Sequence, residues 1–101
     1  MRIVFERSGG IANLQRGLTI DLATLPPEEA DAWRKLVVDS DFFNQPATFP
    51  VPPGADRFQN RVTVEADGKE HTVRVAEGAA PAVLAPLIDR LNEAARAPRK
   101  S

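Results

Sequence analysis

The sequence predicts an α+β fold in two layers, a four-stranded antiparallel sheet with two helices on one face, in the order ββαββα. Four segments alternate apolar and polar residues, as half-buried antiparallel strands do. Two further segments repeat apolar residues with the 3.6-residue period of an amphipathic helix. The 101 residues suffice for one domain, 1–101, in which residues 97–101 are expected to form a frayed tail.

The first 22 residues are expected to form a hairpin of two strands. Residues 2–7 place Ile3 and Phe5 on one face, and residues 16–22 alternate in the same way. A Ser-Gly-Gly run at 8–10 interrupts the alternation. It indicates a tight connection, since paired glycines supply the positive φ angles that such a connection needs. The apolar Ile11 follows Gly10, and this connection either folds back onto the core or forms a contact surface.

The first helix is expected to begin at Pro27 and to end between Asp39 and Asp41. Proline fits the first helical position, where its missing N–H is not needed. Glu28 and Glu29 follow in the first turn, where the helix dipole favours acidic side chains. One face of this helix carries Ala30, Trp33, Leu36 and Val37.

Residues 45–54 contain four prolines and are predicted to form a stiff extended loop. Phe49 and Val51 each precede a proline in this loop. In one interpretation, these two side chains cover an edge of the core and the prolines block strand pairing. In the other, a partner grips the loop, whose stiffness lowers the entropy lost on binding. The residues alone leave both interpretations open.

A second hairpin is expected from strands at 57–65 and 70–75, joined by an Asp67-Gly68 turn. After it, a helical turn at 81–85 should precede the main second helix at 86–96, because Pro86 disfavours helical geometry in the residue before it. The predicted core contains Trp33, Leu36, Val37, Phe42, Leu87, Ile88 and Leu91.

Composition and charge exclude several classes of function. Thirteen basic and fourteen acidic residues give a net charge of -1, which argues against nucleic acid and acidic lipid as partners. The absence of cysteine excludes disulfides, thiol catalysis and cysteine-ligated zinc, and a single histidine excludes a multi-histidine metal site. The N-terminus has no secretory signal and no segment is apolar enough to span a membrane. We therefore expect a cytoplasmic protein without a cofactor or a metal.

No motif in the sequence predicts catalysis. His71 has no recognisable nucleophile or orienting acid, so it is interpreted as a strand histidine that packs at a sheet edge or under a helix. Asp39 and Asp41 lack the remaining ligands of a calcium loop. The run at 8–10 is followed by neither a lysine nor a helix start, which a phosphate loop requires.

An ordered set of motifs over most of the chain resembles the emfourin family, inhibitors of thermolysin-like, protealysin-type zinc metalloproteases. The resemblance extends from Phe5 to about Leu91. The motifs are Phe5-Glu6-Arg7-Ser8-Gly9-Gly10, Leu25-Pro26-Pro27-Glu28-Glu29-Ala30, Asp41-Phe42-Phe43, Pro50-Val51-Pro52-Pro53-Gly54-Ala55-Asp56-Arg57-Phe58 and His71-Thr72-Val73.

This resemblance implies a small cytoplasmic bacterial inhibitor that occupies the active-site cleft of a protease encoded nearby. The zinc belongs to the protease, and the inhibitor is expected to be a monomer when free. The loop from Gln45 to Asp56 would enter the cleft, with Phe49 as the anchor at a position where relatives often carry leucine. The expected protease-binding residues are Phe49, Pro50, Val51, Ile11 and Gly10.

Two other functions compete with inhibition. A non-inhibitory adaptor or assembly domain would use an exposed sheet edge to bind its partner. A small enzyme is disfavoured by the single histidine and the lack of cysteine.

Overall fold

The computed structural model describes residues 1–9, 14–49, 58–76 and 79–96. The order of its strands and α-helices is the predicted ββαββα. The elements are β1 (Arg2–Gly9), β2 (Leu14–Asp21), α1 (Pro27–Asp39), β3 (Phe58–Ala66), β4 (Lys69–Ala76) and α2 (Ala85–Arg96), with 3₁₀ turns η1 (Leu22–Thr24) and η2 (Phe42–Asn44). The predicted tail at 97–101 lies outside the described residues.

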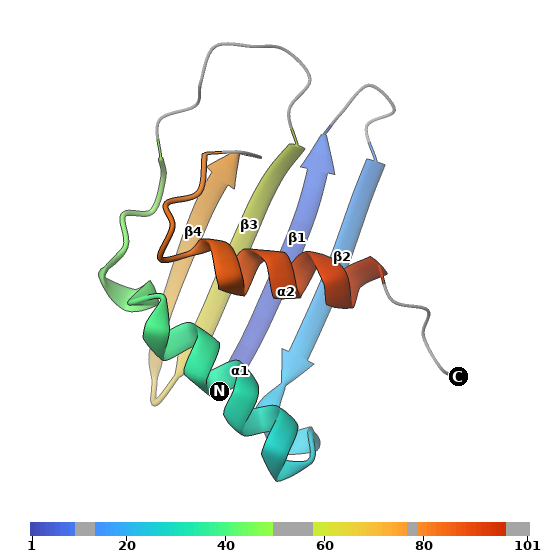
Figure 1. Cartoon of the computed structure of the whole chain (residues 1–101), viewed down its shortest axis with the longest axis vertical. Helices are drawn as coiled ribbons and strands as arrows, with labels where there is room; N and C mark the ends of the chain where they lie inside the picture. Colours follow the sequence, from blue (N-terminus) through green and yellow to red (C-terminus); the bar gives the residue numbers. More distant parts are fainter. Residues whose placement is uncertain (10–13, 50–57, 77–78, 97–101) are drawn as a thin grey trace.

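The four strands form one antiparallel sheet in the spatial order β2-β1-β3-β4. Both helices pack on the same face of this sheet, and α2 crosses in front of the strands (Figure 1). The predicted α+β architecture is therefore confirmed. The two hairpins join through their first strands, β1 and β3, which leaves β2 and β4 at the edges.

The core lies between the sheet and the helices. Alternate residues of the strands enter it, such as Ile3 and Phe5 of β1, both fully buried. Of the predicted core residues, Leu36 is only partly buried, because it lies at the edge of the apolar stripe of α1. The others are buried as expected: Trp33, Val37, Phe42, Leu87, Ile88 and Leu91.

The first hairpin is tighter than the sequence predicts. β1 continues through Gly9, whose φ of 110° suits glycine, and Gly9 pairs with Leu14 of β2. The strands thus occupy residues 8, 9, 14 and 15, half of the segment expected to be a long connection. Cross-strand pairing satisfies the backbone of these residues although they lack an alternating pattern. The second hairpin is as expected: Asp67 and Gly68 have φ of 52° and 78°, the signature of a type I′ turn.

The helix boundaries follow the prolines. Pro27 is the first residue of α1, and Pro26 before it makes no side-chain capping bond. α2 begins at Ala85, so Pro86 stands in its first turn, where no backbone donor is required. The preceding turn is closed by the Leu84 N–H, which donates to the Pro81 carbonyl at 2.9 Å.

Candidate functional site

The described residues beside the two segments that the sequence marks for binding lie at one end of the sheet. Gly9 of β1 pairs with Leu14 of β2 on one side and with Phe58 of β3 on the other. In the chain, segment 10–13 connects β1 to β2 and segment 50–57 precedes β3. β1 ends, and β2 and β3 begin, at the same end of the sheet, the upper end in Figure 1. Four of the predicted binding residues lie outside the described residues: Gly10, Ile11, Pro50 and Val51.

The first part of the proline loop lies along the outer edge of β4. The backbone N–H of Arg74 donates to the Ala47 carbonyl at 2.8 Å, and Thr48 forms a parallel bridge with Arg74. An uncovered edge strand invites pairing with other chains. Residues 45–49 therefore run along this edge, and Ala47 and Thr48 cover it where they pair with Arg74.

His71 fixes the start of the loop. Its Nε2 lies 2.7 Å from the Gln45 carbonyl oxygen, and since a carbonyl only accepts, Nε2 carries the proton and donates. The imidazole also packs edge-on against Phe42, with ring centroids 5.6 Å apart. His71 thus packs at the sheet edge, as its lack of a catalytic partner in the sequence suggests.

Phe49 is half-buried and packs against the hydrophobic core. Its side chain therefore stabilises the fold whatever else it contacts. This packing against the core is what the structural interpretation of the loop expects for Phe49.

A cluster around Arg7 contacts Phe58, the first residue of β3 after the proline loop. Arg7 donates from Nη1 to the Oδ1 atoms of Asn60, at 3.2 Å, and of Asn92 in α2, at 3.1 Å. Its guanidinium carbon lies 4.4 Å from the centre of the Phe58 ring, the first described residue after segment 50–57. The buried Asn60 and the half-buried Asn92 are thus joined to the base of the loop through one cation.

Sequence reasoning missed the role of Arg7. The available signal was its position, since Arg7 follows Phe5 by two residues and so shares its face of β1. A charged residue on a core-facing position requires polar partners, and Asn60 and Asn92 supply them.

Comparison with protein-family models matches residues 5–92 to Emfourin. The chain belongs to the emfourin family. This match confirms the resemblance found in the motifs. It covers β1 from Phe5, all of β2, α1, β3 and β4, and α2 as far as Asn92. No curated protein and no solved structure matches the chain.

Emfourin is a family of protease inhibitors. The match therefore shows a general role in protease inhibition, with a protease as the partner. Within the parts of the chain that the structure describes, no three His, Asp or Glu side chains come together to hold a metal ion. No described helix of this emfourin is long and apolar enough to cross a membrane.

Proposed function

We propose that this emfourin inhibits a thermolysin-like zinc metalloprotease by placing the loop from Gln45 to Asp56 in the active-site cleft. The observation that carries the proposal is that the described residues on both sides of segment 50–57 are held by contacts with the sheet. Hydrogen bonds from His71 and Arg74 hold the start of the loop, and the Arg7 cluster holds Phe58 after its end. The inhibitor would act in the cytoplasm of a bacterium. The zinc ion would belong to the protease and not to the inhibitor.

Fastened ends serve an inhibitor in two ways. They reduce the conformational entropy that the loop loses when the protease grips it, which strengthens binding. They also oppose relaxation of the main chain into the geometry that the protease needs for cleavage. A loop with prolines at 46, 50, 52 and 53 adds its own stiffness to both effects.

Phe49 is the proposed anchor, with Pro50 and Val51 beside it. Thermolysin-like proteases favour a bulky apolar residue just after the scissile bond, as the family resemblance implies, and Phe49 supplies one. Ile11 and Gly10 are proposed as additional contacts. The pairing of Gly9 with both Leu14 and Phe58 supports this, since segments 10–13 and 50–57 begin or end on adjacent strands.

Titration of a thermolysin-like protease tests the proposal. We expect hydrolysis of a peptide substrate to fall to zero near one equivalent of inhibitor, with the inhibitor chain remaining intact on a gel. A serine protease serves as the control and should keep its activity. Binding by calorimetry without loss of hydrolysis would instead support an adaptor, and neither binding nor inhibition would refute the proposed target.

His71→Ala is expected to leave inhibition within a few-fold of wild type, because the backbone bond from Arg74 to Ala47 still holds the start of the loop. The variant loses the hydrogen bond to Gln45 and part of the packing on Phe42, which should lower the free energy of unfolding by about 1–2 kcal/mol. Chemical denaturation gives the stability, and the inhibition constant is corrected for the folded fraction. A hundredfold loss of inhibition in a well-folded variant would mean that His71 acts directly on the protease.

A further inference from the structure

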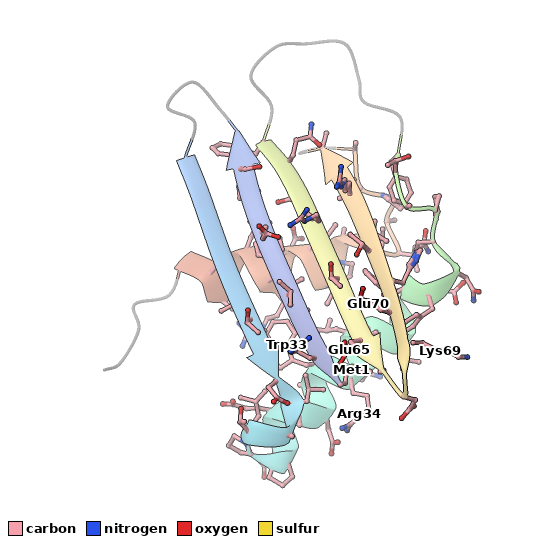
Figure 2. All side chains as sticks on the ribbon, turned by 180° about the vertical axis from the view of Figure 1, so that it is seen from behind. Met1, Trp33, Arg34, Glu65, Lys69 and Glu70 are labelled. Atoms are coloured by element: carbon pink, nitrogen blue, oxygen red, sulfur yellow. The ribbon has the colours of Figure 1, made fainter. Side chains whose placement is uncertain are left out.

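The face of the sheet opposite the helices is lined mostly by polar side chains, in rows across the strands. No described helix covers this face, which Figure 2 presents to the viewer. The strand register defines the rows, because residues paired across strands point to the same side. One row, near the loop end, consists of Gly17, Glu6, Arg61 and Arg74, on β2, β1, β3 and β4 in turn.

This row sets two arginines side by side. Arg61 and Arg74 are directly opposite in the β3–β4 register and both are exposed. Like charges in this position destabilise a sheet. Glu6 neutralises only one of them: Arg61 donates to Glu6 Oε1 from Nε at 3.0 Å and also from Nη2. Among the described side chains, none pairs with the guanidinium of Arg74.

The two arginines flank a hollow of about 740 Å³ at the loop end of this face. Its lining includes Ser8, whose side chain is small, and Gly17, which has none. The backbone does not require glycine at position 17, because an added Cβ would meet nothing nearer than the Phe5 carbonyl oxygen at 3.9 Å. Glycine inside a strand weakens it, and such a residue often marks a place where a ligand or another chain approaches.

The opposite end of the same face is mainly acidic. The row nearest the β3–β4 turn contains Asp21, Arg2, Glu65 and Glu70, and Arg2 pairs with Glu65 at 3.5 Å. Figure 2 labels Glu65 and Glu70 on this end. A continuous polyanion such as nucleic acid would meet repulsion here, whereas a protein segment with a few carboxylates can rest on the arginine end alone.

We propose that this hollow binds an acidic segment of a partner protein, with a carboxylate held between Arg61 and Arg74. A carboxylate there would relieve the repulsion between the two cations, and the guanidinium fork of Arg74 offers it two parallel donors. The hollow adjoins the proline loop, because the backbone N–H of Arg74 also holds Ala47.

NMR titration of the ¹⁵N-labelled full chain with a capped hexaglutamate peptide tests this site. We expect saturable shifts of the backbone amides around the hollow and none with a capped hexaglutamine peptide. Arg74→Glu should weaken binding at least tenfold, because it replaces an attraction with a repulsion. Absence of saturable shifts in the wild type, or shifts spread over all exposed arginines and lysines, would overturn the proposal.

Gly17→Val separates binding from stability. Valine suits a strand better than glycine and its side chain would enter the hollow, so the melting temperature should stay level or rise while peptide affinity falls at least tenfold. Thr19→Val, on the same strand and face but outside the hollow, is the matched control and should keep wild-type affinity. Undiminished binding by Gly17→Val would refute the site.

Two measurements distinguish other occupants of the face. Single-stranded oligonucleotide that binds at the hollow as tightly as the peptide would overturn the acidic-protein assignment in favour of a general anion site. Analytical ultracentrifugation that shows a dimer abolished by Arg74→Glu would overturn it in favour of a second copy of this chain, whose acidic end would then face the arginines.

Discussion

Phe42→Ala is expected to lower the free energy of unfolding by about 3–5 kcal/mol, the typical cost of truncating a buried phenylalanine. Phe42 is 1% exposed and belongs to the hydrophobic core. Its ring also meets Phe43 edge-on, with centroids 5.9 Å apart, and supports His71 at 5.6 Å. The truncation therefore leaves a cavity beside His71, which holds the start of the proline loop through its hydrogen bond to Gln45.

Urea denaturation of three variants measures this effect. Phe42→Leu retains much of the buried volume and should lose far less stability than Phe42→Ala. Val38→Ala is the exposed control, since Val38 is 67% exposed on α1, and should change stability by no more than about 0.5 kcal/mol. A loss of less than about 1 kcal/mol for Phe42→Ala would contradict the placement of this ring in the core.

The fold could be predicted because the buried face of each helix and strand determines the spacing of its apolar residues. Trp33 and Val37 follow the helical period and Ile3 and Phe5 the strand period, and all four are buried in one core. The Asp67-Gly68 turn depends only on local backbone chemistry, so its φ angles were also predictable.

The spatial order of the strands could not be predicted, because no local pattern states which hairpin strand lies in the middle. The same limit applies to contacts between distant parts of the chain. The bond from the Arg74 N–H to Ala47 and the bonds from Arg7 to Asn60 and Asn92 join residues that only tertiary packing brings together. These contacts hold the described residues on both sides of segment 50–57, and the sequence did not predict them. The prolines of the loop did predict that the loop is stiff.

Phe49→Ala is expected to weaken protease inhibition by at least ~2 kcal/mol of binding free energy, or roughly thirtyfold in affinity, the usual cost of truncating an aromatic anchor. Because Phe49 also packs against the core, the variant should lose some stability as well. That loss should be smaller than the ~3–5 kcal/mol of a fully buried phenylalanine. Phe49→Leu should keep inhibition near wild type, since it preserves the apolar contact.

Inhibition per folded molecule decides whether Phe49 binds the protease or only supports the loop. Both the inhibition constant and the free energy of unfolding are therefore measured on each variant, well below its melting temperature. Phe43→Ala is the matched control, because Phe43 is 38% exposed in η2, close to the same loop, and is not a proposed contact. It should leave inhibition per folded molecule unchanged. If Phe49→Ala behaves like Phe43→Ala, Phe49 is a core residue, and the anchor must lie at Val51 or in the segment that contains Ile11.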